Sequence, residues 1–230
     1  MLKKIIYFIS FVLIIILFTI SYLSYFGIKT DRFNNRISNQ LKKNYPKINI
    51  NFTEIKLLLK PLNLLINVET KNPKIIFEDK EIELNKISTN YNIISFFKKE
   101  FGINTLDLET KNSEIQNIVK LLRLNKDTPQ LYILDKVINK GKIFIKAKIN
   151  FDEKGNIKND FKISGKINNL YLKLLKKNEI KDLNLNFNYY DKNLDLKNIN
   201  LSYFDLKISS ENISLKKNNK FYIIKGKLKN

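Results

Sequence analysis

The sequence predicts a mainly β protein, tethered by one N-terminal transmembrane helix and continuing as an antiparallel sheet with two or three short helices. Three observations lead to this fold class. Residues 5–26 form a run of 22 residues without a charge. From Ile48 onward, apolar residues recur at every second position, which is the period of a strand with one buried face. From Gly141 to the end, that pattern is almost continuous.

The N-terminal run is long enough to cross a membrane. At ~1.5 Å per residue, a helix of this length spans roughly 33 Å, and a hydrocarbon core is ~30 Å thick. A secretory signal peptide is the alternative, because two lysines precede the run. A cleavable signal has an apolar region of ~7 to 15 residues and ends in small side chains. Here Tyr22, Tyr25 and Phe26 close the run, as in an interfacial aromatic belt. Residues 1–28 are therefore predicted to be an uncleaved anchor.

The charges beside the anchor leave its orientation open. The flank that follows it is basic, with Lys29, Arg32, Arg36, Lys42 and Lys43. Taken alone, the positive-inside count would keep the large domain in the cytoplasm. Long domains, however, cross membranes largely regardless of their charge. The residues alone therefore do not decide the side.

The composition argues against a nucleic-acid partner, despite a net charge of +20 and a pI of about 9.8. The basic residues are almost all Lys, and only three Arg occur. Lys, Asn and Ile have A/T-rich codons, so an AT-rich genome accounts for the charge as well as a polyanionic partner does. Arg is also the preferred residue for bidentate contacts to phosphate and guanine. We therefore expect no nucleic-acid binding.

Catalytic and metal-binding residue types are scarce. The chain has no Cys and no His, which removes thiol nucleophiles, imidazole bases and the commonest zinc ligands. Three acidic pairs occur: Glu81 with Glu83, Asp107 with Glu109, and Asp152 with Glu153. The first two pairs lie two residues apart on predicted strands, so each is interpreted as charge on a solvated face. We expect no catalytic residue, no cofactor, no metal site and no enzymatic activity.

A short juxtamembrane helix is predicted within residues 29–46. Thr30 is suited to cap it, Phe33, Ile37 and Leu41 recur every four residues, and Pro46 ends it. We interpret its narrow apolar stripe as packing against the first strands. A helix lying on lipid is the alternative.

Residues 47–230 are predicted to form the β domain. Its first half should contain strands at 48–52 and 62–68 and around Leu84 and Leu106, with helices at 92–100 and 113–123. In its second half the connections are short, which predicts an antiparallel meander of hairpins. One side of this sheet is rich in Leu, Ile and Phe and must be hidden from water. A sandwich, a closed barrel or an open sheet curled into a trough would each do so, and periodicity does not choose between them.

The chain resembles the AsmA-like family of bacterial envelope proteins. After the anchor and short helix, the resemblance is carried by strands 47–52 and 62–68 and by five further segments. These are KIIF at 74–77, IELNKI at 82–87, NIISFFKKEFGINTLDL at 92–108, and the "i.G.l" strands FKISGKI at 161–167 and YIIKGKL at 222–228. The resemblance implies a curved, taco-like antiparallel sheet and a single-pass inner-membrane protein with its β domain in the periplasm. The chain differs from many members by being several times shorter.

The resemblance also implies a function, because the family is related to bridge-like lipid transfer proteins whose curved sheets line a hydrophobic groove. We therefore expect phospholipid handling or transport, or a part in outer-membrane assembly, with membrane lipid and other envelope proteins as partners. The candidate groove residues are Ile143, Ile145, Ile149, Phe161, Ile163, Leu183, Leu185 and Phe187. The alternative is a docking module without bound lipid, such as a jelly-roll subunit of a lipopolysaccharide export bridge.

Overall fold

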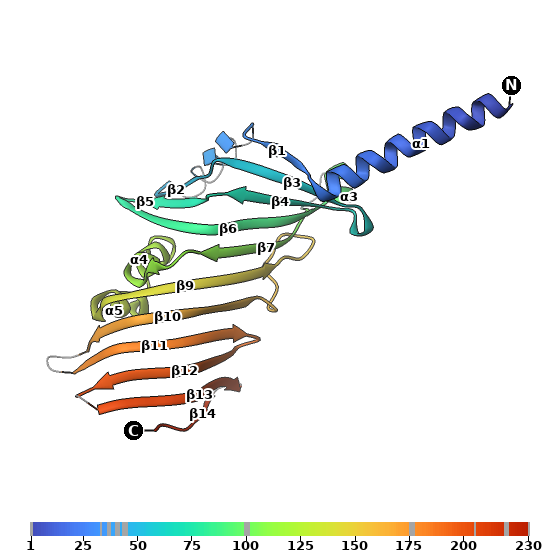
Figure 1. Cartoon of the computed structure of the whole chain (residues 1–230). Helices are drawn as coiled ribbons and strands as arrows, with labels where there is room; N and C mark the ends of the chain where they lie inside the picture. The colour runs from blue at the N-terminus through green and yellow to red at the C-terminus, as the bar shows by residue number, and fades with distance from the viewer. Residues whose placement is uncertain are drawn as a thin grey trace.

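The chain was analysed as a computed structural model, which describes residues 2–32, 34–35, 38–39, 42, 46–98, 102–174, 178–204, 206–218 and 221–229. An N-terminal helix leads into one large antiparallel sheet with few further helices (Figure 1). The helices are α1 (Leu2–Tyr25), the 3-10 helix η1 (Pro61–Asn63), α3 (Ile93–Lys98), α4 (Ile115–Asn125) and α5 (Pro129–Val137). The strands of the first half are β1 (Ile28–Thr30), β2 (Ile48–Asn51), β3 (Glu54–Lys60), β4 (Leu65–Lys71), β5 (Lys74–Phe77), β6 (Lys80–Asn92), β7 (Ile103–Thr110) and β8 (Ser113–Glu114). Those of the second half are β9 (Ile138–Asn150), β10 (Lys162–Lys173), β11 (Glu179–Tyr190), β12 (Asn193–Tyr203), β13 (Leu206–Asn218) and β14 (Phe221–Gly226).

Helix α1 is long and apolar enough to span a membrane, as predicted. Its 24 residues extend about 36 Å at ~1.5 Å per residue. The segment Lys3–Tyr25 has a mean hydropathy of 2.6, and none of its most apolar window is buried against the rest of the chain. The helix ends in a glycine cap, because Gly27 adopts a φ of 70° and its N–H donates to the Tyr22 carbonyl at 3.3 Å. Strand β1 begins at the next residue.

The juxtamembrane segment differs in part from the prediction. Residues 28–30 are extended and pair with β3, with Ile28 opposite Leu57 and Thr30 opposite Ile55. The described residues 34, 35, 38, 39 and 42 are helical. The predicted stripe of Phe33, Ile37 and Leu41 lies outside the described residues. A side-chain amide fixes this segment beside the sheet, because Asn34 Nδ2 donates to the carbonyls of Phe52 and Thr53 at 3.2 and 3.0 Å.

The sheet is open and curved, which selects one of the three arrangements that periodicity allowed. Its strands follow the order β1-β3-β4-β6-β7-β9-β10-β11-β12-β13-β14, with β2 and β5 beside the first half of β6 and β8 beside β9. All these pairings are antiparallel. From β9 to β14 each strand pairs with the next in sequence, as the predicted meander requires. In the described sheet, β1 and β14 are the two ends of the main strand order, and β2 is the outer strand beside β5.

One predicted strand is misplaced and its neighbour was missed. The predicted strand 62–68 begins only at Leu65, because Pro61 opens a 3-10 turn and Leu64 adopts a left-handed conformation with φ 51°. Strand β3 was not predicted because it breaks the alternation of apolar and polar residues. Leu58 lies on the otherwise polar face of β3, where it packs against Gly27 at the end of α1.

Helix α3 lies within the predicted segment 92–100, and α4 overlaps the predicted segment 113–123 but extends to Asn125, whereas α5 was not foreseen. Its start carries ordinary signals: the Thr128 hydroxyl accepts the Leu131 N–H at 3.3 Å, and Pro129 occupies the first turn. Arg123 joins the two helices, since its guanidinium pairs with Asp127 of the connecting loop and Asp135 of α5 and lies 5.1 Å from the Tyr132 ring centroid. Arg123 therefore links α4 to α5.

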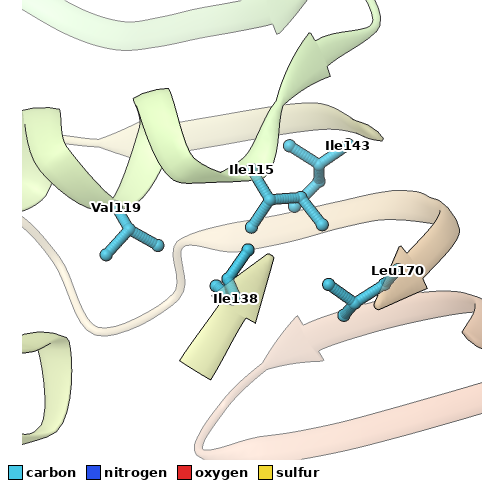
Figure 2. Close-up of a cluster of buried hydrophobic side chains, with 5 residues drawn as sticks. All are labelled: Ile115, Val119, Ile138, Ile143 and Leu170. Carbon is cyan, nitrogen blue, oxygen red and sulfur yellow. The ribbon is translucent and has the colours of Figure 1, made fainter. Parts of the chain in front are cut away.

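The hydrophobic core is small and lies where α4 meets the sheet. One cluster joins α4 to β9 and β10 and consists of Ile115, Val119, Ile138, Ile143 and Leu170 (Figure 2). A second joins α4 to β5 and β6 through Phe77, Ile82 and Leu84. Both are built on side chains from the apolar face of the sheet. Helix α4 thus covers one end of that face, toward β5.

Candidate functional site

The candidate site is the apolar face of the sheet, which the strand register makes continuous. Residues directly opposite one another in neighbouring strands point to the same side. One row therefore crosses eight strands from β6 to β14, which we call the Ile163 row: Ile87, Leu108, Ala147, Ile163, Tyr189, Leu194, Leu215 and Ile224. Seven of its eight members are apolar, and the eighth is a tyrosine.

The adjacent row, displaced by one residue in each strand, is polar throughout and lies on the opposite face. It consists of Lys86, Glu109, Lys146, Ser164, Asn188, Asp195, Ser214 and Lys225. The two faces of the open sheet therefore differ sharply in chemistry. The face of the Ile163 row can contact hydrocarbon, and the opposite face is suited to contact with water.

Most of the Ile163 row remains partly exposed to solvent. From Ile87 to Leu215 its members are half-buried, and Ile224 at the edge strand is 67% exposed. No second sheet packs against this face in the described part of the chain, because all the strands belong to one connected sheet. A strongly apolar surface of this extent on a protein marks an interaction site.

The eight predicted groove residues all project from this face. Ile143, Ile145 and Ile149 alternate along β9, Ile163 lies opposite Ala147, and Leu185 and Phe187 lie opposite Ile167 and Gly165. Phe161 precedes β10 by one residue and stacks on Tyr189 with ring centroids 5.6 Å apart. Leu183 lies beside Leu170, next to an irregularity of the register.

The eight residues differ in burial because α4 and α5 cover only part of the face. Ile143 and Leu185 are 8% and 9% exposed and belong to the core. Ile145, Leu183 and Phe187 are half-buried and pack against the cluster beneath α4. Ile149, Phe161 and Ile163 are half-buried further along the strands. The last three are therefore the positions best placed to meet a ligand.

Gly165 shapes this part of the face, and the sequence alone did not single it out for that role. A Cβ at this position would lie 2.1 Å from the Phe144 carbonyl oxygen and 2.6 Å from the Phe187 ring. The missing side chain lets the Phe187 ring lie across β10. An "i.G.l" glycine opposite an aromatic residue was the available signal.

Two of the three predicted acidic pairs lie on the polar face, where Glu81, Glu83 and Glu109 form ion pairs with lysines. The third pair, Asp152 with Glu153, lies in the turn after β9, where Asp152 accepts the backbone N–H groups of Lys154 and Asn156. Glu83 accepts from Lys111 at 2.9 Å, and its other oxygen lies 3.5 Å from Lys74. The hydrogen bond from Lys111, followed by the charge of that lysine, lowers the pKa of Glu83. Burial alone would raise the pKa of Glu109, but hydrogen bonds from Lys146 and Asn85 outweigh it and lower that pKa. Both groups are ionised at neutral pH and are already paired.

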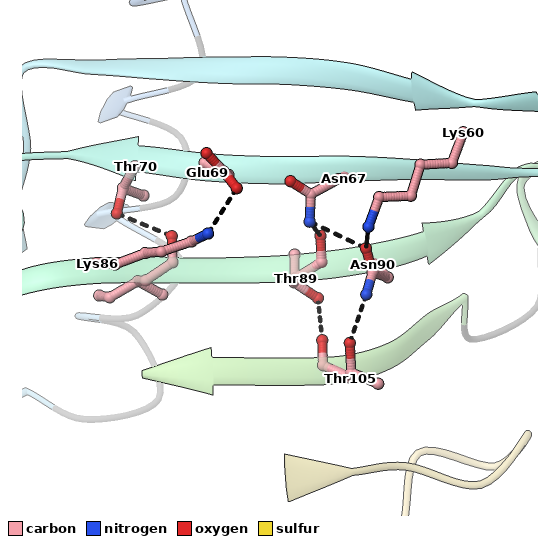
Figure 3. Close-up of polar contacts among 9 residues, drawn as sticks. Lys60, Asn67, Glu69, Thr70, Lys86, Thr89, Asn90 and Thr105 are labelled. Atoms are coloured by element: carbon pink, nitrogen blue, oxygen red, sulfur yellow. Dashed lines mark hydrogen bonds and ion pairs between the residues drawn. The ribbon is translucent and has the colours of Figure 1, made fainter. Parts of the chain in front are cut away.

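Toward the anchor, the polar face carries a network of side-chain hydrogen bonds (Figure 3). Asn90 accepts from Asn67 at 2.9 Å and donates to the Thr105 hydroxyl at 2.8 Å. From the opposite face of the same strand, the Thr89 hydroxyl donates to the Thr105 carbonyl at 2.7 Å. The network ties β4, β6 and β7 together, so its polar groups have a structural role.

Within the described residues, no group of three or more Asp or Glu side chains is placed to share a metal ion. Comparison with known proteins adds no further assignment, since no family model, curated protein or solved structure matches the chain.

Proposed function

We propose that the chain is a membrane-anchored envelope protein that holds the acyl chains of membrane lipids on the apolar face of its sheet. The observation that carries this proposal is the Ile163 row, apolar across eight strands, half-buried, and opposed by a fully polar row. Phospholipid handling or transport, or a part in outer-membrane assembly, is the corresponding role. It agrees with the resemblance to the AsmA-like family.

The dimensions of the apolar face suit an acyl chain. At ~4.8 Å between strands, the seven intervals of the Ile163 row extend roughly 34 Å. One acyl chain covers about half of a ~30 Å hydrocarbon core. The row is therefore longer than a single tail, and each methylene moved from water onto it contributes up to about 0.8 kcal/mol. The row therefore has room for a lipid tail, and its apolar chemistry matches that of the tail.

The test compares two neighbouring residues of β10 that point to opposite faces. We expect Ile163→Asp to remove most co-purifying phospholipid, because it places a carboxylate within the apolar row. Ser164→Asp, on the polar row, should leave the lipid content unchanged. Lipid extracted from protein purified in detergent is measured by mass spectrometry, with circular dichroism confirming that both variants fold. Equal lipid content in the two variants, or lipid-free wild-type protein, would refute the proposal.

For localisation, we propose the inner membrane of a bacterium, with a single span and the β domain in the periplasm. The resemblance to the AsmA-like family supports this side, and helix α1 supplies the span. A reporter fused after Asn230 tests the orientation: alkaline phosphatase should be active there and green fluorescent protein dark. The reverse pattern would place the domain in the cytoplasm.

A docking role is the second candidate, and the edge strand β14 favours it. Phe221, Tyr222 and Ile224 are 75%, 68% and 67% exposed on the outermost described strand. The sheet is single and open, so the jelly-roll form of this alternative, which needs two packed sheets, does not fit. A specific crosslinked protein partner at Tyr222, together with the absence of bound lipid, would favour docking over lipid binding.

A further inference from the structure

The turn between β3 and β4 exposes large apolar side chains beside the membrane helix. We call residues 61–64 the β3–β4 corner. Its Leu62 is 98% exposed and its Leu64 49% exposed. The corner is joined to α3, because the Ile93 N–H donates to the Leu64 carbonyl at 3.0 Å. The next residue of α3, Ile94, is 45% exposed. Three large aliphatic side chains therefore lie on two hydrogen-bonded elements.

The exposure of these side chains is built into the backbone. The Leu64 N–H closes the 3-10 turn onto the Pro61 carbonyl at 3.2 Å, and Leu64 itself adopts φ 51° and ψ 43°. This left-handed conformation is uncommon for a residue other than Gly, Asn or Asp. On the α3 side, the Asn92 side chain accepts the Ile94 N–H at 2.8 Å. The corner is a hydrogen-bonded structure that presents leucines outward.

The corner lies at the end of the sheet from which α1 leaves. Because β1 and β3 are antiparallel and Ile28 pairs with Leu57, the residues of β3 beyond Leu57 run back beside the end of α1. A Cβ on Gly27 would lie 2.3 Å from the Leu57 carbonyl oxygen, so the helix end and β3 are in direct contact. Figure 1 shows the β3–β4 turn and α3 beside the base of α1. A membrane crossed by α1 therefore has its surface at the level of the corner.

The charges around the corner suit a membrane surface. Lys60 directly precedes the corner, and its ammonium donates to an amide oxygen, Asn90 Oδ1 at 3.2 Å, rather than to a carboxylate. Lys98 lies in the last turn of α3. Lysines beside apolar residues extend their ammonium groups toward lipid phosphates. On α1, the exposed rings of Tyr22, Tyr25 and Phe26 belong to the same interfacial layer.

We propose that the β3–β4 corner and the first turn of α3 insert into the headgroup region of the bilayer that α1 crosses. Leu62, Leu64 and Ile94 enter the boundary with the acyl chains, and Lys60 lies at the level of the phosphates. The protein then contacts its membrane at two places, a span and an adjacent insertion. This inference depends on α1 being a membrane span and does not depend on lipid binding by the Ile163 row.

The absence of tryptophan makes the test direct. Leu62→Trp introduces a single fluorophore at a site that makes almost no protein contact, so the fold should tolerate it. The variant is reconstituted at one copy per nanodisc of phosphatidylethanolamine and phosphatidylglycerol. We expect blue-shifted emission, quenching by lipids brominated near the headgroup end of the acyl chain, and protection from acrylamide. Ile133→Trp on α5, 57% exposed in the wild type and distant from α1 in Figure 1, is the control and should behave as a water-exposed fluorophore.

Two outcomes would overturn the inference. In one, Leu62→Trp is as accessible to acrylamide as the control and is not quenched by brominated lipid. In the other, its emission is blue-shifted without lipid quenching, which would indicate that protein covers the corner. A second arm places Trp at Ile94 and adds Leu62→Asp with Leu64→Asp, which should abolish the lipid quenching of that Trp. Unchanged quenching at position 94 would also refute insertion through the corner. The fluorescence of Trp at positions 62 and 94 does not depend on lipid binding by the Ile163 row. Insertion of the β3–β4 corner and lipid binding by that row can therefore be refuted independently.

Discussion

Replacement of Phe77 by alanine should remove a large part of the stability of the β domain. Phe77 ends β5, is 1% exposed, and is the largest fully buried side chain among the described residues. It packs with Ile82 and Leu84 and with the inner side of α4. Truncation of a buried phenylalanine costs about 3–5 kcal/mol, from lost transfer energy and the cavity left behind. A typical domain is stable by only about 5–15 kcal/mol, and this core is small.

The assay is urea unfolding of the full chain in detergent micelles, followed by circular dichroism at the strand signal. With a slope of about 2 kcal/mol per M, a loss of about 4 kcal/mol lowers the urea midpoint by about 2 M. The matched control is Phe221→Ala on the edge strand, where the ring is 75% exposed and the expected change is within about 0.5 kcal/mol. A loss below about 1 kcal/mol for Phe77→Ala, or equal losses for the two variants, would refute the assignment of the core.

Two further predictions concern the anchor joint and the polar face. Gly27→Ala should cost more than about 1 kcal/mol, because the position combines a φ of 70° with a 2.3 Å approach to the Leu57 carbonyl. Gly155→Ala, at a φ of 86° in a hairpin turn, serves as the reference, and an equal loss there would mean that the Leu57 contact is unimportant. Separately, Lys111 lowers the pKa of Glu83 in the folded protein. The ion pair of Glu83 with Lys111 therefore stabilises the fold above the ordinary glutamate pKa of about 4.3, and this stabilisation is lost as the pH falls through the lowered pKa of Glu83. The urea midpoint of unfolding should therefore fall as the pH drops below about 4.3, and it should fall less steeply in Glu83→Gln; parallel pH profiles would contradict this.

Local periodicity predicted the strands wherever one face is solvated. Most positions of β9 to β13 alternate, as expected where one face of the described sheet is polar, and the predicted meander is correct. Strand β3 escaped prediction because Leu58 is covered by the end of α1, a contact between elements that no local pattern contains. Helix α5 was missed although Thr128 and Pro129 form an ordinary helix start. Its short apolar pattern lies directly before the strong strand signal of β9.

The sequence predicted from which face of the sheet the candidate side chains project, but not how exposed each of them is to solvent. Period two places all eight candidate residues on one face, and the register confirms this. Burial of Ile143 depends on where α4 docks, which is a tertiary contact. Open and closed sheets also have the same inward-facing pattern in each strand. The choice between them depends on pairing between distant strands, and the lipid role of the candidates remains a proposal.

If α1 spans a membrane, as we propose, its joint with β1 couples the orientation of the sheet to the tilt of the helix. Only Phe26 and Gly27 separate the helix from the first strand, and the joint is braced by contact with β3. At ~4.8 Å per strand, the far edge of the eleven-strand path lies roughly 48 Å from β1. A 5° change in helix tilt would then displace that edge by roughly 4 Å, and tilting is one way in which a helix adapts to bilayer thickness. The thickness of such a membrane would thereby be one determinant of where the distant strands point.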